Sequence, residues 1–211
     1  MPELPEVETT RRHLAPVVEG AVVIAVEVRR DRMTRRNERP GDLAERMVGR
    51  TVQRLDRRGK FLLAPLGRGI TWVSHLGMSG RLSLNAPGEP EVSHTNVVIR
   101  LRGRPEVRFV DPRTFGFMAA FTDDELAEAM RTVGPDALDD LPTAGALQGV
   151  FAGRRVPIKA LLLDQRVVAS AAGHPVDGQT ELGDGALPPR LPLGRTRGGG
   201  GPHGLSELER Q

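Results

Sequence analysis

The sequence contains no cysteine. A chain without cysteine forms neither a disulfide nor a thiolate zinc site, so its fold must depend on its hydrophobic core. Long apolar runs are absent as well, because stretches such as "GAVVIAV" and "FLLAPL" are too short to span a bilayer and no signal peptide precedes them. We therefore expect a soluble, cytoplasmic protein without a membrane partner.

Basic side chains are abundant but almost all of one type: of the 30 lysine and arginine residues, 28 are arginine. The guanidinium group fits phosphate oxygens, so this bias favours phosphate recognition, although arginine-rich codon usage explains it equally well. The formal net charge is only +3. The length of 211 residues suffices for one sizeable domain or two small ones.

The first half of the chain has the pattern of one helix followed by strands. The helix is expected from about Leu4 toward Ala15. Pro5 suits a first helical turn, whereas Pro16 and Gly20 supply stop signals. Strand-like segments, separated by glycine, proline and asparagine and interrupted by a short helix at 42–49, are expected at 21–29, 51–63, 69–78, 96–103 and 106–121. Several short strands in succession indicate a β-sandwich or barrel.

The pattern becomes helical after residue 121. We expect helices at 122–134, with Thr122 as N-cap, at 144–155 and at 158–169. Residues 170–211 contain ten glycines, five prolines and no aromatic residue. Such a segment cannot bury enough apolar surface to offset its ordering entropy, so we expect a disordered tail.

The opening segment "MPELPEVETT" places a proline directly after the initiator methionine. This methionine is normally removed before a small residue, so we expect the mature chain to begin with the secondary amine of Pro2. An α-amino group has a pKa of about 7.7–8.0, and its attack on an aldehyde-like carbon gives an iminium ion that acts as an electron sink. Glu3 is adjacent for proton transfer, and Glu6 lies one helical turn further. Judged by spacing alone, "PELPE" is more simply a helix start with carboxylates near the positive end of the dipole.

The longer segment "MPELPEVETTRR" closely resembles the N-terminus of formamidopyrimidine-DNA glycosylases, also called the MutM group. Further segments resemble motifs of this family and follow in the family's order: "RRGKFLL" at 57–63, "HLGMSG" at 75–80, "FVDPRTFG" at 109–116, "VGPDAL" at 133–138 and "IKALLLDQ" at 158–165. The resemblance covers roughly residues 1–169.

The resemblance implies an α+β fold, with an N-terminal helix and a β-sandwich catalytic domain followed by an incomplete helical domain of the helix–two-turn–helix type. The implied boundaries are 1–122 for the catalytic domain, 123–143 for a linker and helix, 144–169 for the start of the DNA-binding domain and 170–211 for the tail. Full-length relatives continue with an asparagine loop and a four-cysteine zinc finger. This chain has neither, so we expect no cofactor in it and interpret it as a truncated or frame-shifted product rather than a diverged one.

The resemblance also implies an activity, the removal of oxidised purines such as 8-oxoguanine and formamidopyrimidines from DNA, followed by strand cleavage through β,δ-elimination. Pro2 would attack C1′ of the damaged nucleotide to form a Schiff base. Glu3 would be the proton donor and acceptor beside Pro2, and Lys60 would donate a proton during elimination. Glu6 is a further catalytic candidate because of its spacing from Glu3. The expected protein is a nucleoid-associated monomer of bacterial type that binds damaged double-stranded DNA. The alternative is a non-catalytic DNA- or protein-binding remnant, which would form no covalent adduct.

Other residues match DNA-contacting positions of the family. Met78, Arg113 and Phe115 match the residues that fill the void left by an everted nucleotide. Their glycine-flanked turns between strands favour exposed loop tips. The residues that match the family's phosphate contacts are His94, Arg113, Arg155 and Lys159.

Overall fold

The computed structural model describes residues 3–136, 140, 142–153, 156, 167 and 169. Every described residue belongs to one compact unit, which falls within Met1–His174. The helix expected at 158–169 and the tail expected at 170–211 therefore fall almost entirely outside the described residues.

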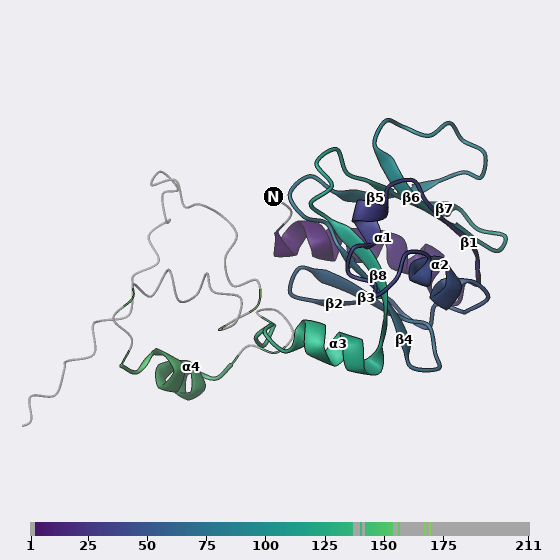
Figure 1. Cartoon of the computed structure of the whole chain (residues 1–211). Coiled ribbons are helices and arrows are strands. Elements are labelled where there is room, and N and C mark those ends of the chain that lie inside the picture. The colour runs from purple at the N-terminus through teal and green to yellow at the C-terminus, as the bar shows by residue number, and fades with distance from the viewer. Residues whose placement is uncertain are drawn as a thin grey trace, which may run out of the picture. The chain divides into compact units, whose positions relative to one another are not determined.

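Two four-stranded antiparallel sheets form the body of this unit (Figure 1). The first sheet has the order β1-β6-β7-β5, made of Val23–Val28, Thr95–Leu101, Glu106–Val110 and Arg81–Asn85. The second has the order β2-β3-β4-β8, made of Asp56–Arg58, Phe61–Pro65, Ile70–His75 and Phe117–Thr122. Together with the N-terminal helix these sheets confirm the expected α+β class for this part of the chain.

The two sheets face each other across one hydrophobic core. Leu62 and Trp72 of the second sheet belong to the same buried cluster as Ile99 and Phe109 of the first. In β3 buried residues alternate with partly exposed ones, because successive side chains of a strand point to opposite faces. The other face of β4 and β8 is buried as well, since helix α3 (Asp123–Met130) packs against it (Figure 1).

Helix α1 begins at Leu4, as expected, but continues to Val18 and so includes Pro16. The prediction that Pro16 ends the helix was wrong. Pro16 costs the helix one backbone hydrogen bond. The last turn forms nevertheless, because Glu19 N–H donates to Ala15 O (3.0 Å) and Val18 is completely buried. The helix ends before Gly20, which adopts a positive φ of 73°.

Two of the strands expected from the sequence are each two strands. The segment 51–63 contains β2 and β3, joined by a tight turn at Gly59 and Lys60 in which Gly59 has a φ of +57°. The segment 106–121 contains β7 and β8, which belong to different sheets. The loop between them begins at Asp111 and turns the chain from one sheet to the other.

Two elements were not predicted, the edge strand β5 and the short 3₁₀ helix η1 (Asp31–Thr34). The expected short helix is α2 (Asp42–Met47), and the helix expected at 144–155 is α4 (Ala144–Phe151). None of the helices in the described part of the chain is both long and apolar enough to cross a membrane.

The N-cap expected for α3 is confirmed. The Thr122 hydroxyl accepts a hydrogen bond from Glu125 N–H (3.3 Å), and the Glu125 carboxylate accepts one from Thr122 N–H (2.7 Å). This reciprocal capping box satisfies two backbone donors at the helix start.

Candidate functional site

Two of the expected catalytic side chains, Glu3 and Lys60, form an ion pair. Glu3 is the N-cap of α1, and Lys60 lies in the turn between β2 and β3. The Lys60 side chain is only 7% exposed and the Glu3 side chain 16%. A lysine that merely ended a strand would remain in water, because burying an ammonium group is costly without a partner. The fold thus places this acid and this amine together, 57 residues apart in sequence.

Glu6 has a different position. Its carboxylate is exposed and accepts a hydrogen bond from Glu3 N–H (3.0 Å). Glu6 therefore stabilises the start of α1 and orients the backbone of Glu3. Pro2, the expected nucleophile, lies outside the described residues, directly before Glu3 in the chain.

His75 lies beside this site, although the sequence analysis gave it no role. Its ring stacks on Phe117, with centroids 5.7 Å apart, and its Nδ1 accepts a hydrogen bond from Gly77 N–H (3.2 Å). Burial lowers the pKa of His75 to about 4, helped by the nearby positive charges of Lys60, Arg35 and Arg36. The imidazole is therefore neutral at pH 7, with its proton on Nε2.

The three expected void-filling residues lie on two loops that touch each other. Met78, between β4 and β5, is 45% exposed, and Phe115, between β7 and β8, is 46% exposed. Arg113, on the same loop as Phe115, is also exposed. The loops approach so closely that a Cβ added to Gly77 would lie 2.4 Å from the backbone nitrogen of Gly116. Only glycine fits there, and the exposed side chains project from a common base.

Asp111 joins the two loops and is completely buried. One carboxylate oxygen accepts hydrogen bonds from the Ser79 hydroxyl (2.7 Å) and Arg113 N–H (3.1 Å), and the other accepts from Gly116 N–H (2.8 Å). The sequence analysis assigned no role to Asp111. The sequence feature that could have identified it is an aspartate directly before a proline at the start of a turn. The side chain of such an aspartate commonly accepts hydrogen bonds from the backbone N–H groups of the next few residues.

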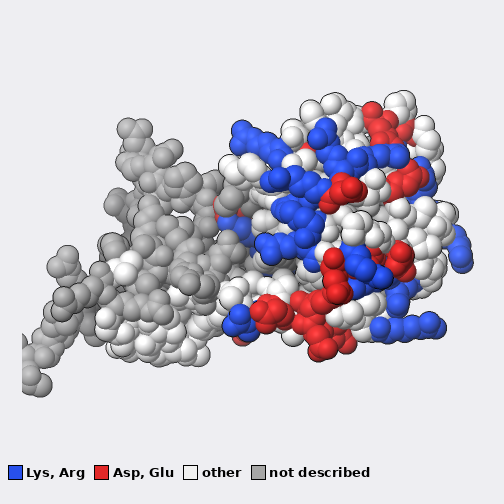
Figure 2. All heavy atoms as spheres, in the orientation of Figure 1, with Lys and Arg blue, Asp and Glu red and all other residues white. Residues whose placement is uncertain are grey.

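Arginines of the η1 region hold the second loop from outside. Arg35 donates to the carbonyls of Gly116 (2.6 Å) and Phe115 (2.9 Å), and Arg32 donates to that of Thr114 (3.3 Å). Burial and the neighbouring positive charges lower the pKa of Arg35. Figure 2 shows Lys and Arg side chains gathered in a band on the face toward the viewer. The bonds from Arg32 and Arg35 to the β7–β8 loop join residues about 80 positions apart in sequence, so the local sequence could not predict them.

The remaining expected DNA contacts are only partly described. His94 is exposed in a left-handed conformation (φ 66°), and its carbonyl accepts a hydrogen bond from Asp111 N–H (3.1 Å), which places it next to the β7–β8 loop. Arg155 and Lys159 lie outside the described residues. In the described part no group of three histidine, aspartate or glutamate side chains could hold a metal. The sequence also lacks the four thiolates of the family's zinc finger, so its residues do not fit that metal site.

Comparison with known proteins identifies relatives that all belong to one enzyme family. The profile of the formamidopyrimidine-DNA glycosylase N-terminal domain matches residues 1–118. The formamidopyrimidine-DNA glycosylase of Moorella thermoacetica is 43% identical over 171 residues, which are 80% of this chain and 62% of the relative. That of Caulobacter vibrioides is 42% identical over 183 residues, 80% of this chain and 63% of the relative.

Solved structures agree with these sequence relatives. Lactococcus lactis Fpg in complex with DNA containing an abasic site matches with a TM-score of 0.72 and 28% identity, over 80% of this chain and 62% of that one. The same enzyme bound non-covalently to DNA with an abasic site matches with a TM-score of 0.73 and 27% identity, over 80% and 65%. The chain thus spans less than two thirds of the length of the relatives it matches.

Proposed function

Because the chain belongs to the formamidopyrimidine-DNA glycosylase family, we propose that it is a DNA repair glycosylase that also cleaves the strand at abasic sites. The observation that carries the proposal is the mostly buried ion pair between Lys60 and Glu3, the residue that directly follows Pro2 in the chain. Its substrates are oxidised purines in duplex DNA, notably 8-oxoguanine and ring-opened purines.

Base removal starts at the N-terminal amine. Once Met1 is removed, the Pro2 nitrogen forms a bond to C1′ of the damaged nucleotide while the bond from C1′ to the base breaks. Glu3 transfers the protons that this exchange requires, as its place beside the amine in the sequence allows. The sugar ring then opens: the C1′–O4′ bond breaks, O4′ takes up a proton, and the Pro2 nitrogen forms a second bond to C1′. The product is an iminium ion that joins Pro2 to the opened sugar, and its positive nitrogen cannot be neutralised by loss of an N–H proton.

Strand cleavage uses the same intermediate. The iminium acidifies the C2′ protons, so removal of one of them expels the 3′ phosphate, and a second elimination releases the 5′ phosphate. Lys60 donates a proton during this sequence and places a positive charge near the backbone. The support for this role is its burial against Glu3, which keeps an ammonium group at the site instead of in bulk water.

Eversion of the damaged nucleotide leaves a gap in the duplex that must be filled. Met78, Arg113 and Phe115 suit this task, because they project from two loops fixed by the buried Asp111. A flexible thioether, a planar guanidinium and an aromatic ring can each insert between bases. Residues that contact phosphates in this proposal are His94, Arg113, Arg155 and Lys159.

The test compares two DNA substrates with the purified 211-residue chain. An abasic site has already lost its base, so we expect slow strand cleavage at low salt. An 8-oxoguanine duplex requires eversion, which costs a few kcal/mol and depends on contacts that the family places in its asparagine loop and zinc finger. We therefore expect little release of 8-oxoguanine, with or without added zinc.

Each outcome of this comparison has a clear meaning. Cleavage of the abasic duplex with elimination products supports the lyase, whereas an intact strand after prolonged incubation supports the binding remnant. Robust release of 8-oxoguanine by this chain at physiological salt would show that these 211 residues recognise and evert the lesion, and would contradict the expected dependence on the family's asparagine loop and zinc finger.

A further inference from the structure

A buried aspartate that belongs to neither sheet, Asp136, holds the turn that carries Lys60. Asp136 follows α3 in the chain, and its side chain is 6% exposed. Its carboxylate accepts two hydrogen bonds from the Arg57 guanidinium, at 2.5 and 2.8 Å, and one from Gly59 N–H at 2.6 Å. Both partners precede Lys60 by one to three residues, so Asp136 holds the turn on the side where the chain enters it.

Arg57 extends this contact to the helix that carries Glu3. Its side chain is 1% exposed, and its guanidinium also donates to Gly59 O (3.0 Å). Its Nε lies 3.4 Å from an oxygen of Glu8 on α1. The helix and the turn that bear the two members of the Glu3–Lys60 pair are therefore connected through one buried guanidinium.

The backbone of Asp136 is itself fixed by a later segment of the chain, at Ala169. Asp136 and Ala169 form a parallel bridge, in which Ala169 N–H donates to Pro135 O at 2.8 Å. Ala169 is completely buried. The chain thus returns, 33 residues later, to the residue that holds the Lys60 turn.

Such an arrangement restricts movement of the turn. Bidentate arginine–carboxylate bonds fix both distance and orientation, and they are strong where water is excluded. Removing one partner deprives the other buried charge of its bidentate contact. Lys60 reaches Glu3 through a flexible side chain, so the position of its ammonium depends on how firmly the backbone of the turn is held.

We propose that Asp136 is a positioning residue that holds the Lys60 ammonium against Glu3 through Arg57 and the Gly59 N–H. This inference rests on the proposed lyase function. Asp136 acts on the reaction indirectly, through its bonds to Arg57 and Gly59.

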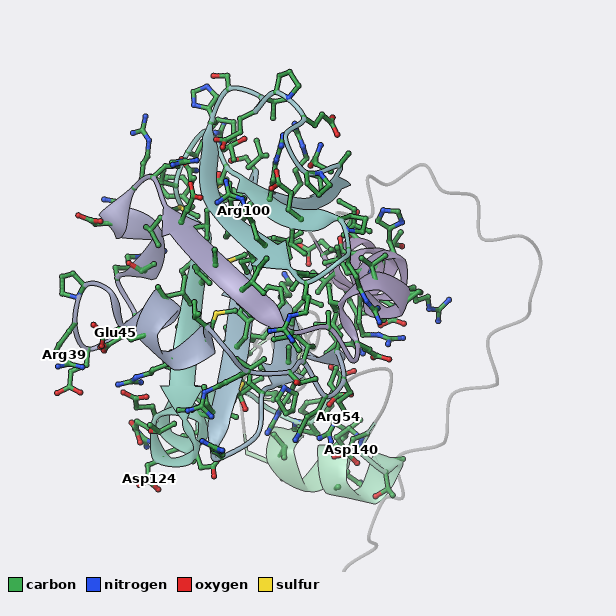
Figure 3. All side chains as sticks on the ribbon, turned by 90° about the vertical axis from the view of Figure 1, so that its right-hand side faces the viewer. Arg39, Glu45, Arg54, Arg100, Asp124 and Asp140 are labelled. Carbon is green, nitrogen blue, oxygen red and sulfur yellow. The ribbon has the colours of Figure 1, made fainter. Side chains whose placement is uncertain are left out.

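The experiment uses Asp136→Asn in the full chain, with Asp124→Asn as the matched control. Asp124 is exposed at the start of α3 and points away from the sheets (Figure 3). For Asp136→Asn we expect single-turnover cleavage of abasic DNA to fall by about 10- to 100-fold, because small displacements of a catalytic group have effects of that size. The dissociation constant for the same DNA should change by less than about threefold, since the Asp136 side chain is buried and offers almost no surface for contact. Asp124→Asn should match the parent chain in both measurements.

A second measurement does not depend on activity. Hydrogen exchange at the Gly59 amide should accelerate by about tenfold or more in Asp136→Asn, because its charged acceptor is lost. Exchange at the Gly80 amide, bonded to Leu76 O, should not change. Arg57→Gln should slow cleavage as Asp136→Asn does, and the double variant should be no slower than either single one, since all three variants break the Arg57–Asp136 contact.

The outcomes separate this inference from the proposed function. If the parent chain cleaves abasic DNA but Asp136→Asn cleaves it equally fast, the positioning role is wrong. The same conclusion follows if exchange accelerates equally at Gly59 and Gly80, because the effect is then a general loss of stability. If the parent chain does not cleave DNA at all, the proposed function fails, and the Gly59 exchange alone decides whether Asp136 holds the turn.

Discussion

At the scale of single residues, the site depends on charges that the fold removes from water. Lys60 and Glu3 are both mostly buried, and each is the partner that makes burial of the other tolerable. His75, in contrast, is kept neutral by burial and by the positive charges around it. The site thus combines an ion-paired lysine with an uncharged imidazole.

The proposed role of Glu3 predicts a separation of chemistry from binding. Glu3→Gln keeps the shape of the side chain but removes the titratable proton, so the residual base excision of the parent chain should become undetectable while association with damaged duplex persists. Single-turnover excision assays and binding isotherms measure the two quantities. Glu128→Gln, on the exposed surface of α3, is the control. Unchanged excision in Glu3→Gln would exclude it as the proton-transfer group.

The lowered pKa of His75 predicts how stability depends on pH. Its folded pKa is about 4 against an ordinary value of 6.5, so the unfolded chain binds this proton more readily. The contribution of a neutral His75 to stability is therefore complete above pH 6.5 and is lost as the pH falls toward 4, by about 3 kcal/mol in total. Urea unfolding at a series of pH values should show a shallower acid loss for His75→Gln than for the exposed control His13→Gln. Parallel curves for the two variants would contradict the lowered pKa.

At the scale of elements, the two loops that carry Met78 and Phe115 behave as one unit. Asp111 accepts hydrogen bonds from both loops, and Arg35 holds the second loop by its carbonyls. Neither loop has regular secondary structure, so these side-chain bonds replace the backbone ladders that stabilise the sheets.

This arrangement predicts the effect of Asp111→Asn. The amide has one acceptor oxygen, so it cannot serve both the Ser79–Arg113 side and the Gly116 side of the carboxylate. The free energy of unfolding should fall by about 1–3 kcal/mol, because a buried N–H is left without an acceptor. Binding to damaged duplex should weaken along with it, whereas Asp124→Asn should change neither. Stability and binding equal to those of the parent chain would show that Asp111 does not fix the loops.

Elements whose limits are set locally could be predicted from the sequence, and those set by distant contacts could not. Thr122 caps α3 through bonds to residues three positions away, which sequence spacing reveals. Pro16 is a local stop signal that burial of Val18 overrides. The division of 106–121 between two sheets depends on Asp111 and leaves no trace in the apolar pattern.

At the scale of the whole molecule, the fold brings together residues that are far apart in sequence. Glu3 and Lys60 could be selected only because their motifs resemble those of a family, since spacing alone gave no reason to pair them. The Arg57–Asp136 contact spans 79 residues and could not be predicted even with the motifs known. The described sheets correspond to the family's N-terminal domain, and the chain spans 62–63% of its curated relatives' length.

The central claim is that the Pro2 amine bonds covalently to the sugar, and reductive trapping measures this bond. Borohydride reduces the iminium to a stable amine, so the chain with a processed N-terminus, mixed with abasic-site DNA, should yield a protein–DNA adduct that peptide mapping assigns to Pro2. A chain that retains Met1 or carries an N-terminal extension has no secondary amine at this position and should form no adduct. Equal trapping by the processed and the extended chain, or an adduct mapped to a lysine, would contradict the account.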